Sequence, residues 1–444
     1  MALQLQRLHR FPPMIYQSLS DKLWNRHEIA LLNLLSRSVK KLLAILLVLP
    51  ILFAPTSFAA PKKISVTPLK FITDVGNNID FAGLVLSQSN IVIFGSTSEL
   101  SGSAAFVRAI DKTGIQQWKL SLDAGAEEIA TAGITDAAGN IWIAGSFSPT
   151  PTQTVETATV TPSVNPDEVI NEPVQPIRED MNYVGIWKVS PQGDVLSSFN
   201  LKLDYPALIT SIAVDNAGVS LAGLTNVGKG NVGILVNCSS AGVCNTPIFI
   251  GTRDTSLDGV IRISDGAQIV IGSSTETILD KKVQGLRDGI IVSVAKTGKI
   301  SKVIRSSAAK ASRNWSSATN TLFFGGEVIT GKKIESSVTK FSNTFTPTWT
   351  YRFASTGAVF NAVGPSKSHY SFFASTSVIT NISGWNPKRA SGLVIAFDSK
   401  GAITGAYSAA ALVQPRAMAY SKDLGLVVAG VSGDTVSIFN LISR

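Results

Sequence analysis

The sequence predicts an all-β fold, namely a seven-bladed β-propeller with a composite closing blade formed by both termini. Three observations lead to this prediction. A short apolar segment of the type WIAGSFS occurs seven times, the copies recur about every 50 residues, and no helical period is found after Ala60. The copies align on Gly95, Gly145, Gly223, Gly272, Gly325, Ala374 and Gly430.

Each copy is expected to be the second strand of a four-stranded blade. Such a strand is covered on both faces by neighbouring sheets and therefore reads as a continuous apolar run. The glycine is expected to permit a bend and a close approach of the next backbone. Third-strand patterns begin at Ala104, Tyr183, Asp288, Ser336 and Ser391. Four short strands per unit favour a propeller over a two-sheet sandwich. Seven second strands favour seven blades over a six-bladed ring with a separate N-terminal strand.

The two ends of the chain are expected to share the closing blade. The C-terminal segment GDTVSIFNLISR supplies a third strand, and residues 73–98 supply two strands without a partner of their own. Outer strands would then come from one terminus and inner strands from the other, which leaves the ring without an exposed edge. This arrangement predicts that Phe439 pairs within the blade that contains the strand Ile91–Phe94.

Residues 40–60 read as a signal peptide. Lys40 and Lys41 precede an apolar run from Leu42 to Ala54, and small residues follow. Cleavage is expected after Ala59 or Ala60. No cysteine lies near this leader, so a lipid has no thiol there to which it could attach.

An uncleaved anchoring helix at 42–60 is the alternative interpretation, although Pro50 interrupts the apolar run. Residues 1–39 are either a long n-region or a spurious upstream extension. The sequence thus predicts a secreted or extracytoplasmic protein whose propeller spans residues 62–444. Contact with a membrane is expected only through the leader, if it is not cleaved.

The net charge of +9 is concentrated near the N-terminus. Residues 1–60 hold seven Lys or Arg side chains against two acidic ones, so the remaining chain is only mildly basic. No basic stripe interleaved with aromatic residues is present, which argues against nucleic acid as a partner.

Residues 149–180 interrupt the repeat. This segment contains six prolines, many threonines and several acidic residues, and it lacks the periodicity of a buried element. Its composition predicts a disordered insertion loop within the propeller.

Cys238 and Cys244 are the two cysteines of the chain. Their spacing suits a disulfide that closes a hairpin loop in an exported protein. Two thiolates are too few for a metal site, and no metal or cofactor is expected.

The sequence offers no complete catalytic set. His369 is the only histidine after residue 60 and reads as a solvated turn residue, so Ser/His/Asp and Cys/His catalysis lack support. Glycine-rich phosphate loops and HExxH motifs are absent. Carboxylates near the innermost strands remain, as in propeller glycosidases. The candidates for such an activity are Glu128, Asp258 and Arg416.

The repeat unit resembles bacterial secreted β-propeller repeats of the SBBP type. DAAGNIWIAGS from Asp136 and AAFVRAIDKTGIQQW from Ala104 carry the resemblance, and DKTGIQQW also resembles quinoprotein-type blades. Later copies lack the tryptophan, as in AKTGKISKVI. The resemblance covers about residues 62–444 and implies a fold, but it implies little about function because propellers serve in binding, scaffolding and catalysis alike.

One face of the ring is the expected binding face. Connections between second and third strands vary in length, whereas the other turns are mostly tight, and binding residues collect on variable loops of a rigid scaffold. The basic sector of this face consists of Lys281, Lys282, Arg287, Lys332, Lys333, Lys388 and Arg389. The acidic insertion on the same face is expected to shield this sector partly from an acidic partner.

These features together predict an exported β-propeller that acts as a binding or scaffolding module of the bacterial envelope or exterior. Its partner is expected to be an envelope or extracellular polymer or protein: a glycan, an anionic polymer or a protein ligand. The alternative is a carboxylate-dependent propeller glycosidase or lyase.

Overall fold

The computed structural model of the protein describes residues 63–77, 79–99, 102–150, 178–263 and 266–441. The n-region, the signal peptide with its cleavage site after Ala59 or Ala60, and residues 151–177 of the insertion lie outside the described residues. Within these ranges the fold is all-β, and the one helical element is the short 3₁₀ turn η1 (Pro365–Lys367). No helix in the described part of the chain is long and apolar enough to cross a membrane.

Five four-stranded sheets account for most of the strands. The first has β3 (Ile79–Ser87), β4 (Asn90–Glu99), β5 (Gly102–Ile110) and β6 (Gln116–Leu122), and the second has β7 (Glu127–Thr135), β8 (Ile141–Ser148), β9 (Tyr183–Val189) and β10 (Val195–Lys202). The third has β11 (Ala207–Asp215), β12 (Gly218–Asn226), β13 (Asn231–Ser239) and β14 (Ile248–Ile250), and the fourth has β15 (Thr255–Arg262), β16 (Gln268–Ser274), β17 (Asp288–Val294) and β18 (Ile300–Ser306). The last has β28 (Leu412–Ser421), β29 (Gly425–Ser432), β30 (Thr435–Leu441) and β2 (Lys70–Asp74).

A ten-stranded sheet lies between the fourth and the last of these sheets. It begins with β19 (Ser312–Arg313), β20 (Ser317–Ala318), β21 (Phe323–Thr330) and β22 (Lys333–Phe341), and it continues through the long strand β23 (Pro347–Val363). Beyond β23 follow β24 (His369–Ser375), β26 (Ser391–Phe397), β27 (Ile403–Ser408), β1 (Ile64–Pro68) and β25 (Ile382–Ser383). Strand β23 pairs with β22 through its first half and with β24 through its second half, so it joins two groups of strands.

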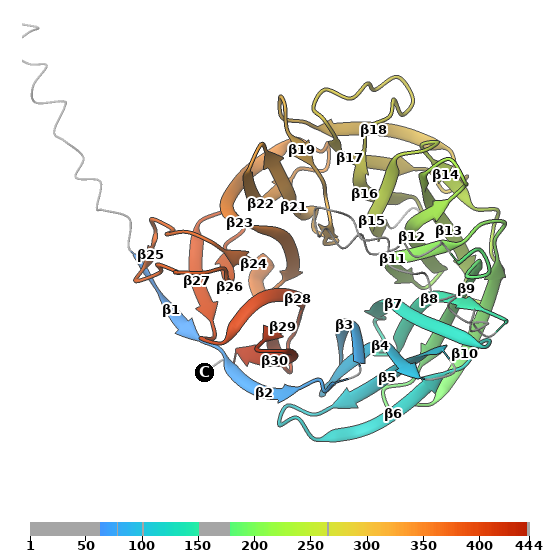
Figure 1. Ribbon diagram of the computed structural model, residues 1–444, viewed down its shortest axis with the longest axis horizontal. Coiled ribbons are helices and arrows are strands. Elements are labelled where there is room, and N and C mark those ends of the chain that lie inside the picture. The colour runs from blue at the N-terminus through green and yellow to red at the C-terminus, as the bar shows by residue number, and fades with distance from the viewer. Residues whose placement is uncertain (1–62, 78, 100–101, 151–177, 264–265, 442–444) are drawn as a thin grey trace, which may run out of the picture. The chain divides into compact units, whose positions relative to one another are not determined.

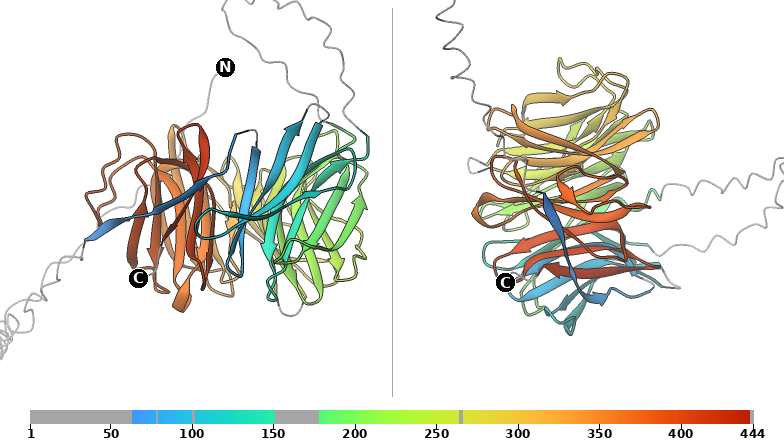
Figure 2. Two further views of the ribbon diagram at one scale, coloured as in Figure 1. Left: turned by 90° about the horizontal axis from the view of Figure 1, so that it is seen from below. Right: turned by 90° about the vertical axis from the view of Figure 1, so that its left-hand side faces the viewer.

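The sheets stand around a common centre, as in a β-propeller (Figure 1). Their innermost strands contact one another in the order β3, β7, β11, β15, β20, β23 and β28, and β28 contacts β3 again. Hydrophobic clusters fill the spaces between successive sheets. The cluster between the last sheet and the first contains Ile91 and Ile93 together with Val427 and Ile438. Packing therefore continues around the whole ring. Figure 2 shows the ring from the side, with the strands of the sheets running from one end of the ring toward the other.

All seven copies form strands, namely β4, β8, β12, β16, β21, β24 and β29. The second-strand prediction is confirmed in the five four-stranded sheets, and β21 and β24 lie within the ten-stranded sheet. The five third-strand signals likewise form β5, β9, β17, β22 and β26. Complete burial explains why these segments were visible in the sequence: every residue of β8 and of β16 is buried.

The repeat glycine faces a bulge in the preceding strand rather than the next backbone. In β15, Asp258 is an extra residue between Leu257, which pairs with Gly272, and Gly259. A Cβ on Gly272 would overlap the carbonyl oxygen of Ser256. The same register shift occurs in β3, β7, β11 and β28. The glycine is therefore required where the first strand bulges against the second.

The fifth copy was aligned one residue too early. A Cβ on Gly326 would overlap the carbonyl oxygen of Asn314, whereas a Cβ on Gly325 would meet the side chains of Asn361 and Val359. Gly326 is thus the equivalent of Gly272. The sequence GG at this point allowed both alignments, and only the position of the preceding strand distinguishes them.

Both termini contribute to the last sheet, but the predicted division of its strands was wrong. Phe439 pairs with Phe71 of β2 and with Val428 of β29, and not with the sheet that contains Ile91–Phe94. Three strands of the last sheet come from the C-terminal end, and the N-terminal end supplies only the outermost strand, β2. Strand β1 pairs in parallel with β27 of the preceding sheet. The physical reason is that β3 and β4 already have their partners in β5 and β6, so they were not available to the C-terminal end.

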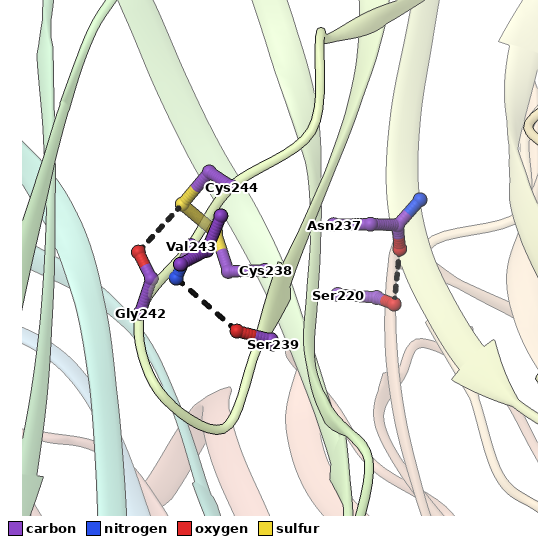
Figure 3. The surroundings of a disulfide bond; sticks show 7 residues. All are labelled: Ser220, Asn237, Cys238, Ser239, Gly242, Val243 and Cys244. Atoms are coloured by element: carbon purple, nitrogen blue, oxygen red, sulfur yellow. Dashed lines mark hydrogen bonds between the residues drawn. A yellow bond between two sulfur atoms is a disulfide. The ribbon is translucent and has the colours of Figure 1, made fainter.

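The predicted disulfide between Cys238 and Cys244 is confirmed, with a Cα–Cα distance of 3.9 Å. It connects the end of β13 to the segment that leads into β14 (Figure 3). The turn between the two cysteines is held by hydrogen bonds, among them one from the Val243 amide to Ser239 Oγ at 3.2 Å. The disulfide is compatible with an extracytoplasmic location.

Candidate functional site

A polar cleft of about 310 Å³ lies where the fourth sheet meets the ten-stranded sheet. Its walls come from the starts of β13 and β15, the end of β16, the segment before β17, and strands β19 and β21. It therefore opens at the end of the ring where second strands lead into third strands. The lining residues are Asn231, Asp254, Thr255, Ser256, Ser273, Arg287, Ser312, Arg313, Asn314 and Glu327. Hydroxyl, amide, carboxylate and guanidinium groups thus converge, with no large apolar side chain among them.

Hydrogen bonds order one wall of the cleft. Arg287 forms an ion pair with Asp254 and donates from Nη1 to Ser273 Oγ at 3.1 Å. Ser273 Oγ lies 3.2 Å from Ser256 Oγ, and Ser256 donates in turn to Asp258 Oδ2 at 3.3 Å. This chain of contacts fixes Arg287 against β15 and β16, so its charge is already compensated.

Asp258 and Glu327 are two half-buried carboxylates of this region. Burial raises the pKa of Asp258 to about 6, the hydrogen bond from Ser256 and the charge of Arg287 oppose this rise, and the negative charge of Glu327 adds to it. Burial also raises the pKa of Glu327. Strongly perturbed carboxylates in a cleft are typical of functional sites, although structural networks also produce them.

Arg313 is the unusual cation of the cleft. Its guanidinium carbon lies 4.2 Å from the centre of the Trp315 ring, and Nη2 donates to Ser337 Oγ at 3.1 Å. Its Nε is buried without a hydrogen-bond partner, and within the described ranges Arg313 forms no ion pair. Burial, with a smaller contribution from the charge of Arg352, lowers the pKa of Arg313 to about 10. Because guanidinium remains charged at neutral pH, the site holds a poorly compensated positive charge.

Backbone contacts place Arg313 and its neighbour at the cleft. The Arg313 amide donates to the carbonyl of Arg287 at 2.9 Å, and the Asn314 amide donates to the carbonyl of Glu327 at 3.1 Å. Strand β19 is therefore held between the fourth sheet and β21. The side-chain oxygen of Asn314 is buried and accepts no hydrogen bond.

The three catalytic candidates from the sequence do not come together. Glu128, Asp258 and Arg416 lie on β7, β15 and β28, which are not neighbours in the ring. Glu128 is buried and accepts hydrogen bonds from the amides of Gly125 at 2.6 Å and Ala124 at 3.3 Å, so it holds the turn before β7. Burial raises the pKa of Glu128.

Arg416 is the bulge residue of β28 and lines a different recess, beside Val75 and Phe81. Only Asp258 adjoins the polar cleft. The carboxylate whose charge acts on Asp258 is Glu327, which the sequence did not single out.

The basic sector lies on three successive connections between second and third strands. Arg287 lines the cleft, and Lys281 and Lys333 form ion pairs of 2.9 Å with Asp280 and Glu335. The side chains of the other four members form no ion pair within the described ranges. These four members are Lys282, Lys332, Lys388 and Arg389. Nearly half of the predicted charge is therefore neutralised locally.

His369 is not a solvated turn residue, contrary to the expectation from the sequence. It is the first residue of β24 and is 1% exposed. Its ring packs against Phe323 at 4.7 Å and Trp349 at 6.1 Å, and Nε2 lies 3.3 Å from Thr321 Oγ1. These partners come from β21, β23 and the turn before β21, which short-range sequence reasoning does not bring together.

A departure from the repeat could have identified the cleft. With the fifth copy aligned on Gly326, the position after the repeat glycine is Glu327, while the other copies have Ser96, Ser146, Leu224, Ser273, Ser375 and Val431. Asp258 likewise occupies a bulge position that is Ala82, Thr131 and Thr210 in three other strands. An acidic residue where no other copy has one is thus the signal for Glu327, and for Asp258 the bulge position is otherwise uncharged except for Arg416 in β28.

No family model and no curated protein matches the chain. Among solved structures, virginiamycin B lyase from Staphylococcus aureus is similar over 84% of this chain and 99% of its own, with 10% identity and a TM-score of 0.45. The Dos1 propeller is similar over 85% of this chain and 82% of its own, with 10% identity and a TM-score of 0.45. A streptogramin B lyase is similar over 82% of this chain and 97% of its own, with 12% identity and a TM-score of 0.40. Likenesses of this strength carry no conclusion about fold, activity or ligand.

Proposed function

We propose that the protein is an exported β-propeller that serves as a binding or scaffolding module of the bacterial envelope or exterior. Its ligand is anionic and binds in the polar cleft. The observation that carries this proposal is Arg313, a partly buried guanidinium with an unpartnered Nε and no ion pair within the described ranges. A buried charge without a counterion is costly, and an anion that reaches the cleft would compensate it.

The seven-bladed architecture is part of the same proposal. It treats the ten-stranded sheet as two blades joined through β23. The seven innermost strands that contact one another around the ring support this count. We also propose that residues 40–60 are a signal peptide, that the propeller spans residues 62–444, and that its repeats are related to those of the SBBP type. Fractionation of a bacterium that expresses the full chain, with mass determination of the exported product, tests the leader and its cleavage after Ala59 or Ala60.

Binding to a panel of polymers tests the anion site. The panel contains polygalacturonate, heparin, polyphosphate and neutral dextran, and the proteins are the wild type, Arg313→Gln and Lys332→Gln. Lys332 is the matched control because it is an exposed cation of the same face, outside the cleft. We expect Arg313→Gln to weaken polyanion binding by about 10-fold or more, since hydrogen bonds to charged groups contribute about 1.5–3 kcal/mol. We expect Lys332→Gln to weaken it less than about 3-fold. Equal losses in both variants would indicate diffuse charge attraction and contradict the cleft assignment, and a lack of binding to every polyanion would contradict the proposal.

A carboxylate-dependent glycosidase or lyase remains the second candidate. The observation that favours it is the raised pKa of both Asp258 and Glu327, since glycan cleavage uses a protonated acid beside an ionised carboxylate. Incubation of the protein with each bound glycan, followed by analysis of reducing ends and of unsaturated products, distinguishes the two functions. Turnover that disappears in Asp258→Asn and Glu327→Gln would support the enzyme, and binding without turnover would support the module.

A further inference from the structure

The cleft contains unsatisfied groups of two opposite kinds. Arg313 offers a buried Nε donor and a positive charge. Asn314 offers a buried side-chain oxygen without a donor. The Glu327 carboxylate takes part in no hydrogen bond or ion pair within the described ranges, although its position is half-buried. A fitting ligand must therefore bring one anionic group and, close to it, uncharged hydrogen-bond donors.

The two arginines of the cleft are each held by neighbouring side chains. Arg313 is held over Trp315, which is fully buried, and its Nη2 is bonded to Ser337. Arg287 is already bonded to Asp254 and Ser273. Within the described ranges no carboxylate forms an ion pair with Arg313, so a ligand can compensate its charge.

We propose that the ligand group bound in this cleft is a polyhydroxylated carboxylate, namely a uronate residue of an acidic glycan. The proposal rests on the anion-binding function given above and names its ligand. The sugar carboxylate would accept hydrogen bonds from Arg313, and the neighbouring sugar hydroxyls would donate to Asn314 Oδ1 and to Glu327. The hydroxyl groups of Ser273 and Ser312 can donate or accept around the same ring.

Other ligand classes satisfy only part of the cleft. Phosphate and sulfate groups would compensate Arg313, but they bring few or no hydrogen-bond donors for Asn314 and Glu327. A neutral sugar would satisfy Asn314 and Glu327, yet it would leave the charge of Arg313 buried. A peptide with a free terminal carboxylate is the nearest competitor, because its amides also donate. Against it stands the set of serine, threonine and asparagine side chains, which suits many hydroxyl groups, and a cleft volume at the lower end of the range for ligand sites.

Matched ligands give the sharpest experiment. Isothermal titration calorimetry with the full chain, as exported and oxidised, compares a galacturonate oligosaccharide with its methyl ester, which keeps the hydroxyl groups and loses the charges. Inorganic polyphosphate provides charge without hydroxyl donors, and a short peptide with a terminal carboxylate represents the competitor. We expect the oligogalacturonate to bind at least 10-fold more tightly than each of the other three.

Two variants assign this preference to individual residues. Arg313→Gln should weaken oligogalacturonate and polyphosphate alike. Asn314→Leu, which removes the acceptor at similar volume, should weaken oligogalacturonate by about 5- to 20-fold and leave polyphosphate unchanged, as expected for a lost hydrogen bond. The ligand comparison on the wild-type protein needs neither variant, so the proposal stays testable even if Asn314→Leu does not fold.

The possible outcomes separate this inference from the function on which it rests. Equal binding of the methyl ester would show that the cleft does not recognise the sugar carboxylate and would overturn the inference. Tighter binding of polyphosphate through Arg313 would refute a uronate as the ligand but would support the proposed anion-binding function. Tighter binding of the peptide would replace the glycan by a protein ligand. A failure of all four ligands to bind would overturn both the inference and the proposed function.

Discussion

Protonation of His369 gives a quantitative test of the packing around β24. Burial lowers the pKa of this imidazole from 6.5 to about 4, and the charge of Lys340 adds to the effect. Above pH 6.5 neither the folded nor the unfolded state binds the proton. Between pH 6.5 and about 4 only the unfolded state binds it, so the free energy of unfolding falls as the pH falls through this window. Roughly 2.5 pKa units correspond to about 3 kcal/mol.

Asp258 contributes with the opposite sign in the same window. Burial raises its pKa from 3.8 to about 6, so between these values the folded state binds a proton that the unfolded state does not. This carboxyl therefore stabilises the fold at low pH, and the stabilisation of about 2–3 kcal/mol disappears as the pH rises through 6. The two residues partly cancel in the wild-type protein, which makes single variants more informative than the wild type alone.

Thermal melts of the wild type, His369→Gln and Asp258→Asn from pH 4 to pH 7.5 test both values. For a domain of roughly 380 residues, about 3 kcal/mol corresponds to about 4 °C in Tm. Relative to the wild type, His369→Gln should gain about 4 °C and Asp258→Asn should lose about 3 °C as the pH falls from 7 to 4. The remaining titrating groups are common to all three proteins and drop out of the comparison. Parallel curves for the wild type and His369→Gln would show that His369 is accessible to protons in the fold and would refute the packing described here.

Three further predictions concern the scaffold. Intact-mass analysis with alkylation should find no free thiol before reduction, and the Cys238→Ser, Cys244→Ser double variant should lose about 2 kcal/mol in denaturant titrations, the value expected for closing so short a loop; two labelled cysteines without reductant would contradict the disulfide. Gly326→Ala should lower stability by more than 3 kcal/mol because its Cβ meets a backbone carbonyl, and Gly325→Ala should cost about 1–3 kcal/mol because side chains can move; the reverse order would restore the original alignment of the fifth copy. Deletion of residues 152–176 should leave the melting temperature nearly unchanged. Deletion of residues 152–178 should destabilise the fold by about 1–3 kcal/mol, because it removes Arg178, which forms ion pairs with Asp180 and with the buried side chain of Glu127. Equal melting temperatures of the two deletion variants would contradict a structural role for these ion pairs.

The sequence was informative wherever a strand is buried on both faces. The seven repeated strands and the five strands that follow them could be predicted because their residues are apolar almost without interruption, as in IWIAGSFS. The disulfide was found because Cys238 and Cys244 flank a short turn. In each of these cases the signal lies within a single segment of the chain.

The outer strands and the closure were less visible for a physical reason. Strands β1 and β2 are mostly exposed or half-buried, so KFITD shows no continuous apolar run. Their partners β27 and β30 lie more than 300 residues away in the sequence, and no local pattern specifies such pairing. The polar cleft has the same difficulty, because it joins side chains from sheets that are successive in the ring but come from separate repeats.

The repeat itself offers a way to separate charges that the fold needs from charges that it does not. The other six copies form the same strand with an uncharged residue after the repeat glycine, or after Ala374 in β24. The packing of this strand therefore does not require the carboxylate of Glu327. Burial raises the pKa of Glu327, which means that its ionised form at neutral pH is unfavourable in this position. Glu327→Ser, which restores the residue of most other copies, should therefore raise the stability at pH 7.5 by about 0.5–2 kcal/mol and weaken binding of oligogalacturonate in the calorimeter. Ala374→Gly, another change toward the repeat, serves as a control that should leave ligand binding unaltered, since this residue lies on β24, away from the cleft. A loss of stability in Glu327→Ser would show that the carboxylate supports the fold after all, and unchanged binding would remove it from the ligand site.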